Sequence, residues 1–171
     1  MGQRIIHCGA SGSGLAAKIC NNLVLGVQQI VVAEAMLLGQ RLGLDPVVLA
    51  SVINNSTGSC WSSSVNNPVP GALPEKSPPC ERDFDDGFAT ALMIKVSNVI
   101  HIYEPVHTEG PSRQDLGLAT EVSKSSGSPV PLGEAAESIY ADAVKRYPEL
   151  LKKDFSSVYR YLEKRGRKDD E

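Results

Sequence analysis

The feature that most constrains this fold is a stretch over residues 15–42 that contains no proline and is dominated by Ala, Leu, Val, Gln and Glu. This composition predicts one long helix, which at the rise of an α-helix spans about 40 Å. Its middle is apolar nearly all round, so we expect neighbouring elements to bury it on several sides. The stretch therefore predicts a bundle built around one long central helix.

Residues typical of helix ends mark the remaining elements. Gly43 is expected to end the long helix as a glycine cap, and Asp45 with Pro46 opens a second helix that reaches about Asn54. A loop rich in proline and charge is predicted over residues 68–86. Strand signals are nearly absent, so the predicted fold class is all-α. Further helices are expected from residues 59–61, over 88–95, after 115, over 130–145 and after Asp154.

Composition excludes several classes of function. The 171 residues suffice for one domain with a core, and a formal net charge of −3 with 5% aromatic residues argues against a nucleic-acid partner. The four cysteines show no C-x-x-C spacing, so no metal site is expected and the thiols are interpreted as reduced, in an intracellular protein. No run of 18 apolar residues occurs, which predicts no membrane-spanning helix. Residues 1–7 resemble neither a secretory signal nor a transit peptide.

A glycine-rich motif precedes the long helix. Residues 9–22 have the pattern G-x-x-G-x-G-x-x-x-K-x-x-x-N, and no strand precedes the glycines as a dinucleotide loop would require. The glycines are interpreted as a close-packed helix entry. Lys18 and Asn22 share one helix face about one turn apart, where they could hold a hydroxyl and a carboxylate together. The alternative is a solvated surface lysine with an asparagine neighbour.

This motif resembles the catalytic-helix signature of the β-hydroxyacid dehydrogenase family, and in particular its 3-hydroxyisobutyrate dehydrogenases. The resemblance continues in order along the chain and covers almost all of it except residues 96–114. It implies that residues 9–165 form a helical domain like the carboxy-terminal domain of 6-phosphogluconate dehydrogenase. The further matching blocks are 33–36, 41–46, 59–63, 67–71, 87–88, 92–95, 115–119 and 153–158.

The resemblance assigns the substrate side of the site. In the family a hydride passes from the substrate to NAD while a lysine manages the hydroxyl proton, and Lys18 matches that lysine. Burial in a dry cleft would suit this role because it disfavours the charged form. Asn22 matches a residue that orients the substrate, and Gly14 belongs to the same substrate-binding stretch. Trp61 would line the substrate side, although it could equally be a core tryptophan.

The resemblance also assigns the cofactor side. Lys95 matches a lysine that reaches NAD from the helical domain, Asp115 completes the family's Lys-Asp pair, and Phe88 would pack near the cofactor cleft. In the family a Rossmann domain precedes the helical domain. Residues 1–8 resemble only its last strand, and residues 166–171 are a charged tail. We therefore expect the chain to lack the nucleotide-binding domain and to be inactive alone.

Residues 96–114 separate Lys95 from Asp115, which are adjacent in the family. Prolines within this segment would break a helix, so it is expected to loop out as an insertion. Its two histidines are not expected to form a metal site. A translated intron is a hypothesis for its origin, because valine codons begin with GT and a glutamine codon can be CAG, and the segment runs from Val96 to Gln114.

Three functions remain open on the sequence. The first is the helical domain of an NAD-dependent enzyme that oxidises 3-hydroxyisobutyrate to methylmalonate semialdehyde in valine breakdown. Family members of this type are mitochondrial and oligomerise through the helical domain, with a small hydroxyacid substrate and neither nucleic-acid nor membrane partners. The second is a dehydrogenase domain for another short β-hydroxyacid, such as one yielding tartronate semialdehyde. The third is a non-enzymatic helical dimerisation module.

Overall fold

The computed structural model describes residues 5–94 and 115–166. Every regular element in these two ranges is a helix, and the β pairing found within them is one isolated antiparallel bridge between Ala89 and Asp154. The all-α prediction is therefore confirmed for the described part of the chain. The α-helices are α1 (Ser13–Arg41), α2 (Pro46–Asn54), α3 (Trp61–Ser64), α4 (Asp115–Ser126), α5 (Pro131–Arg146) and α6 (Val158–Arg165). The 3₁₀ helices are η1 (Pro79–Arg82), η2 (Thr90–Leu92), η4 (Pro148–Lys152) and η5 (Phe155–Ser157).

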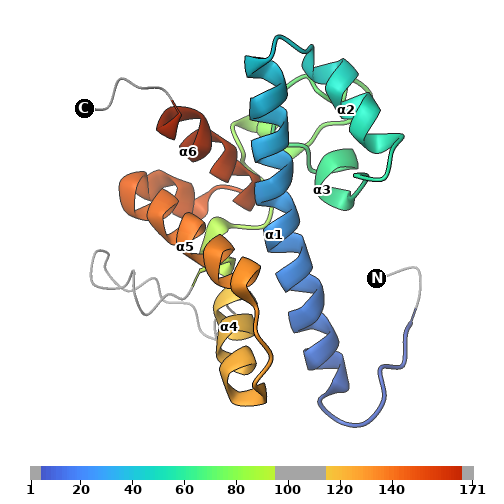
Figure 1. Ribbon diagram of the computed structural model, residues 1–171, viewed down its shortest axis with the longest axis vertical. Helices are drawn as coiled ribbons and strands as arrows, with labels where there is room; N and C mark the ends of the chain where they lie inside the picture. The colour runs from blue at the N-terminus through green and yellow to red at the C-terminus, as the bar shows by residue number, and fades with distance from the viewer. Residues whose placement is uncertain (1–4, 95–114, 167–171) are drawn as a thin grey trace.

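Helix α1 forms the axis of the molecule. Figure 1 shows it running through the middle, with α4, α5 and α6 on one side and α2 and α3 on the other. All five of these helices contact α1. An apolar helix surrounded in this way removes its side chains from water on several faces, which is what its sequence pattern required.

Glycine is favoured at both ends of α1 by the backbone conformation. Gly12 has a φ of 91° at the start of the helix, and a Cβ built there meets nothing within 4 Å. The prediction of a close-packed glycine entry is therefore wrong at this position, because the left-handed conformation is what favours glycine. At the other end Gly43, with a φ of 84°, lets the Leu44 amide donate to the Gly39 carbonyl at 2.9 Å. The predicted glycine cap is confirmed as a Schellman motif.

The predicted start of α2 is confirmed in atomic detail. The carboxylate of Asp45 accepts hydrogen bonds from the amides of Val47 at 2.9 Å and Val48 at 3.1 Å, and Pro46 occupies the first helical position. These bonds satisfy amides that have no partner inside the helix.

A predicted element over residues 88–95 differs from the structure. Instead of an α-helix, the described part contains only η2, and Lys95 lies outside the described residues. The amide of Phe88 donates to the Asp154 carboxylate at 2.7 Å, and the amide of Thr90 donates to the Lys153 carbonyl at 2.8 Å. These amides pair with a segment distant in sequence, so the chain enters η2 from an extended conformation.

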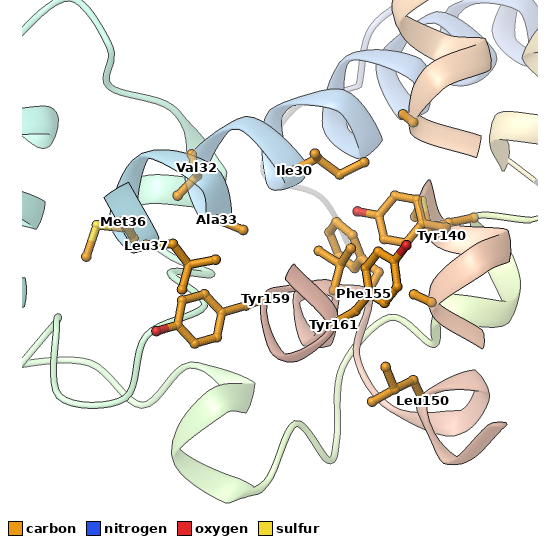
Figure 2. Close-up of a cluster of buried hydrophobic side chains, with 14 of the residues drawn as sticks. Ile30, Val32, Ala33, Met36, Leu37, Tyr140, Leu150, Phe155, Tyr159 and Tyr161 are labelled. Atoms are coloured by element: carbon orange, nitrogen blue, oxygen red, sulfur yellow. The ribbon is translucent and has the colours of Figure 1, made fainter. Parts of the chain in front are cut away.

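The core lies where α1, α5 and α6 meet. Figure 2 shows Leu37 of α1 beside Tyr159, and Tyr140 of α5 beside Phe155 and Tyr161. Tyr140, Phe155 and Met36 are fully buried. Burial raises the pKa of Tyr140 well above its ordinary value of 10.0, and its hydroxyl donates to the Gly26 carbonyl at 3.3 Å. Apolar residues on α1 therefore meet aromatic residues from the carboxy-terminal third of the chain.

Helix α1 also has the length and apolarity of a membrane-spanning helix, with a mean hydropathy of 1.5 over its most apolar window. The search for 18 consecutive apolar residues did not detect this property of α1, because a few polar residues interrupt the apolar stretch. Half of that window is buried inside the fold. Packing against the five neighbouring helices accounts for the apolar residues on the buried half.

Several predictions concern residues at the margins. Residues 5–8, interpreted as a strand remnant, are exposed and irregular. Residues 1–4, the insertion at 96–114 and the tail beyond residue 166 lie outside the described residues.

Candidate functional site

A cleft of about 790 Å³ opens between the amino-terminal half of α1, the start of α3 and the segment around η2. We call it the Lys18 cleft. It brings together four of the residues singled out in the sequence, although they are separated by up to 70 positions (88 − 18). The lining residues are Lys18, Asn21, Asn22, Val24, Leu25, Gln28, Trp61, Phe88, Leu92 and Met93.

The polar floor of the Lys18 cleft comes from α1. Asn21, Asn22, Leu25 and Gln28 follow Lys18 at intervals of three, four, seven and ten residues, which places them on one face of the helix. Asn22 is buried, and its Oδ1 accepts a hydrogen bond from Nδ2 of the Asn21 side chain at 3.4 Å. Sequence reasoning missed Asn21 and Gln28, although their helical spacing from Lys18 was a sufficient signal.

Two aromatic side chains form the walls. Trp61 is 40% exposed and Phe88 is 55% exposed, so the reading of Trp61 as a core residue is wrong. The Phe88 ring packs edge-on against Phe155, with 6.4 Å between the ring centroids. Leu92 and Met93 continue the apolar wall beyond Phe88. The cleft thus combines one cation and several amides with a largely apolar side.

Of the other predicted site residues, only Gly14 has a described environment, and it is not among the residues that line the Lys18 cleft. Gly14 lies about one turn before Lys18 on α1, is exposed, and has nothing within 4 Å of its Cβ position. Asp115 begins α4, and its predicted pair with Lys95 falls on residues outside the described side chains. Lys18 itself is exposed. The described residues therefore do not enclose Lys18 in a dry cleft.

A buried carboxylate lies behind the Phe88 wall. Asp154, which is 2% exposed, accepts hydrogen bonds from Asn66 Nδ2 at 3.0 Å and from the Phe88 amide at 2.7 Å. It also accepts from the amide and the hydroxyl of Ser156, at 2.9 Å and 2.5 Å. Asn66 in turn connects to α1, because its carbonyl accepts from Gln29 Nε2 at 3.2 Å. The cap that Asp154 forms with Ser156 agrees with the helix start predicted after Asp154, whereas no sequence pattern indicated the links to Asn66 and Phe88, which lie far from it in the chain.

The chain before Phe88 is strained. Asp83, Phe84 and Asp86 have φ values of 55°, 63° and 61°, and the left-handed region costs a non-glycine residue of order 1–3 kcal/mol. We call residues 83–87 the strained turn. Its Phe84 carbonyl accepts from the Asp154 amide at 2.7 Å. At Gly87, a Cβ would overlap the Asp154 carboxylate, so this position requires glycine.

Surface charges hold the strained turn from outside. Lys153 Nζ lies 2.7 Å from Asp83 Oδ2 and 2.9 Å from Asp85 Oδ1, and Arg160 pairs with the other oxygen of Asp83. Hydrogen bonds from Lys153 and then Arg160 lower the pKa of Asp83 to about 2 from its ordinary 3.8. The same contacts with Asp83 and Asp85 raise the pKa of Lys153. The Arg160 guanidinium also lies 4.7 Å from the centre of the Phe84 ring.

Among the described residues, no group of three or more His, Cys, Asp or Glu side chains could hold a metal ion. The cysteines are all free thiols. Cys80 is buried and donates to the Asn67 carbonyl at 3.1 Å, and burial raises its pKa to about 12.

Comparison with known proteins adds sequence and fold relationships to this geometry. A protein-family model described as the NAD-binding domain of NADP-dependent 3-hydroxyisobutyrate dehydrogenase matches residues 12–101. The mitochondrial 3-hydroxyisobutyrate dehydrogenase of Drosophila melanogaster is 44% identical, with 96% of this chain and 44% of that protein aligned. The mitochondrial enzyme of Homo sapiens is also 44% identical, with 95% of this chain and 41% of that protein aligned.

A solved structure agrees with these relatives. The Mycobacterium tuberculosis 3-hydroxyisobutyrate dehydrogenase, determined with L-serine, superposes with a TM-score of 0.74 at 42% identity. The superposition covers 93% of this chain and 46% of that chain. The present chain thus spans less than half the length of each of these three relatives.

The matching family model is described as an NAD-binding domain, and the relatives are dehydrogenases, so these matches relate the chain to the class of dehydrogenases with an NAD(P)-type cofactor. Within that class, the family match extends over more than half of the residues of the chain. The chain belongs to the 3-hydroxyisobutyrate dehydrogenase family.

Proposed function

We propose that this chain supplies the helical side of the active site of an NAD-dependent 3-hydroxyisobutyrate dehydrogenase, with Lys18 as its acid/base residue. The carrying observation is the Lys18 cleft, in which Lys18 and Asn22 face the same space as Trp61 and Phe88. One cation with amide donors suits a small carboxylate that bears a hydroxyl. The apolar wall suits its methyl substituent and a planar cofactor ring.

The residues of the Lys18 cleft fit the nicotinamide end of the cofactor. Phe88, Leu92 and Met93 present an apolar surface, and Phe88 exposes more than half of its side chain there. We propose that these side chains hold the nicotinamide ring, with Lys95 and Asp115 acting further along the cofactor. NAD bound there would supply the acceptor for the hydride that leaves the substrate carbinol carbon.

The chain's own residues would manage the substrate. We assign to Lys18 the removal of the hydroxyl proton, a role that needs the lysine in its neutral form. Because Lys18 is exposed in the described residues, desolvation must come from bound ligand or from another part of the enzyme. The Asn22 side-chain oxygen accepts from Asn21, which leaves the Asn22 NH₂ group to donate to a substrate carboxylate. Gly14 would leave room for the substrate at the amino-terminal end of α1.

Residues 9–165 are proposed to form one domain of the 6-phosphogluconate dehydrogenase carboxy-terminal type, with residues 96–114 inserted. The packing of five helices around α1 supports this assignment. We further propose that the enzyme acts in valine breakdown and, like the relatives named as mitochondrial, in mitochondria.

A chimeric enzyme tests the proposed function. Residues 9–165 replace the aligned part of the Mycobacterium tuberculosis relative, with and without residues 96–114, and NADH formation from 3-hydroxyisobutyrate is followed. We expect turnover from the chimera without the insertion and none from the isolated chain. Lys18→Ala should lower kcat by at least about 100-fold. The control Lys124→Ala, at an exposed position on α4, should leave it unchanged.

The same assay separates the alternatives. A chimera that oxidises glycerate or L-serine much faster than 3-hydroxyisobutyrate would favour another short β-hydroxyacid as substrate. A folded chimera with no turnover on any of them, or one in which Lys18→Ala is silent, would contradict the proposed function.

A second candidate function, self-association, rests on exposed apolar residues of α1, of which Val24 also lines the Lys18 cleft. Val24, Val31 and Leu38 lie seven residues apart on α1 and are 53%, 55% and 60% exposed. A heptad spacing of exposed apolar residues is typical of helices that pair. Sedimentation of the chain should show a dimer that Val31→Glu dissociates. Leu132→Glu, at a leucine on α5 that is 68% exposed, is the control. A monomer at all concentrations would remove this candidate.

A further inference from the structure

We propose that Asp154 is a positioning residue for the Lys18 cleft, which acts by fixing the backbone of Phe88 so that the Phe88 ring forms the cleft wall. This inference deepens the function proposed above and rests on it for its catalytic consequence. Its structural core, the link from a buried carboxylate to an exposed aromatic ring, stands on the described residues alone.

The strained turn cannot hold itself in place. Three non-glycine residues in the left-handed region persist only where surrounding contacts determine their conformation. Besides the ion pairs of Lys153 and Arg160, these contacts include two backbone hydrogen bonds: the amide of Asp154 donates to the Phe84 carbonyl, and the amide of Phe155 donates to the Phe88 carbonyl. The backbone from Phe84 to Phe88 is thus attached at both ends to residues 154–155.

The Asp154 side chain completes this attachment. One of its oxygens accepts from Asn66 and from Ser156, while the other accepts from the Phe88 amide at 2.7 Å. The carboxylate is the acceptor in all four of its hydrogen bonds, which come from Asn66, Phe88 and two groups of Ser156. In Asp154→Asn one acceptor oxygen becomes an NH₂ group, which would face another donor. Gly87 allows the close approach, because any Cβ there would overlap the carboxylate.

The result of this attachment is visible at Phe88. The Phe88 amide donates to the Asp154 carboxylate, and the Phe88 ring packs edge-on against the fully buried Phe155. The rest of the ring lines the Lys18 cleft. A side chain that is 55% exposed has few contacts of its own to fix it. We therefore assign the orientation of this wall to Asp154 rather than to packing around Phe88.

The test uses ¹⁹F NMR on the 171-residue chain labelled with 4-fluorophenylalanine. The chain has three phenylalanines, Phe84, Phe88 and Phe155, and single Phe→Leu variants assign their resonances. In Asp154→Asn we expect the Phe88 resonance to move to its unfolded-chain position while that of Phe84 stays dispersed. Ser157→Ala removes another buried polar group of η5, and should leave all three resonances in place.

Hydrogen exchange on the unsubstituted chain keeps the proposal falsifiable if Asp154→Asn does not fold. The Phe88 amide should exchange at least about tenfold more slowly than in the free chain, because it donates to a buried carboxylate. Free-chain exchange at Phe88, or an unmoved Phe88 resonance in folded Asp154→Asn, would overturn the proposal.

The chimera distinguishes this inference from the proposed function. If both are right, Asp154→Asn raises the KM for NAD about threefold to tenfold with a smaller change in kcat, and Ser157→Ala changes neither. An inactive parent chimera with the expected NMR result would refute the proposed function and leave the positioning role standing. An active chimera whose KM for NAD is unchanged in folded Asp154→Asn would refute the catalytic consequence.

Discussion

Truncating Phe155 should be among the most damaging single changes in this chain. Its side chain is fully buried where α1, α5 and α6 meet, and its ring contacts the Phe88 ring, with 6.4 Å between the centroids. Replacing such a residue with alanine costs about 3–5 kcal/mol through lost burial and the cavity left behind. About 0.5–1.5 kcal/mol of this belongs to the aromatic pair. Domains of this kind are stable by only about 5–15 kcal/mol, so a large fraction is lost.

Urea denaturation measures this effect, with Trp61 as the single tryptophan reporter and far-UV circular dichroism as a second probe. Phe88→Ala should cost less than Phe155→Ala, because Phe88 is 55% exposed. The double variant isolates the ring contact, with an expected coupling of about 0.5–1.5 kcal/mol. A cost below about 1.5 kcal/mol for Phe155→Ala would refute its central place in the core. Zero coupling would refute the Phe88 contact.

Three further predictions concern single groups. Asp45→Ala should lower the free energy of unfolding by about 1 kcal/mol in urea denaturation, whereas Asp45→Asn should be nearly neutral, because both residues can cap α2. The folded pKa of Asp83 is about 2 against an ordinary 3.8, so its pairing with Lys153 and Arg160 stabilises fully above pH 4 and is lost as the pH falls toward 2. Asp83→Asn should make the thermal midpoint depend less on pH over that range. An unchanged dependence of the midpoint on pH would contradict the pairing. In a thiol-reagent assay on the native chain, Cys80, with a pKa of about 12, should react only after unfolding.

Much of the helical framework could be predicted from local sequence. The Asp45–Pro46 start, the Gly43 end and the long proline-free stretch were all read correctly, because capping and helix propensity depend on neighbouring residues. The same holds for the face that carries Lys18 and Asn22, since helical spacing alone places them together. The roles given to these residues came from family resemblance and stay predictions.

The errors occurred where partners are distant in sequence. The segment after Phe88 was predicted as an α-helix, but its amides pair with Lys153 and Asp154. Trp61 left two readings open, because only the packed chain decides whether a tryptophan lies in the core or at a cleft. The sequence likewise left open whether Lys18 lies in a cleft or on a solvated surface, and in the structure it is exposed and lines the Lys18 cleft.

The sequence by itself determined the all-α class, the ends of the first two helices, and a lysine and an asparagine on one face of α1. Those features arise from interactions within a few residues, which a linear pattern records. Only the tertiary structure decided that Trp61 and Phe88 join this face, and that a buried carboxylate 66 residues after Phe88 holds its backbone. Hydrogen bonds and packing between distant segments depend on how the helices fold back on each other, and no local pattern encodes that geometry.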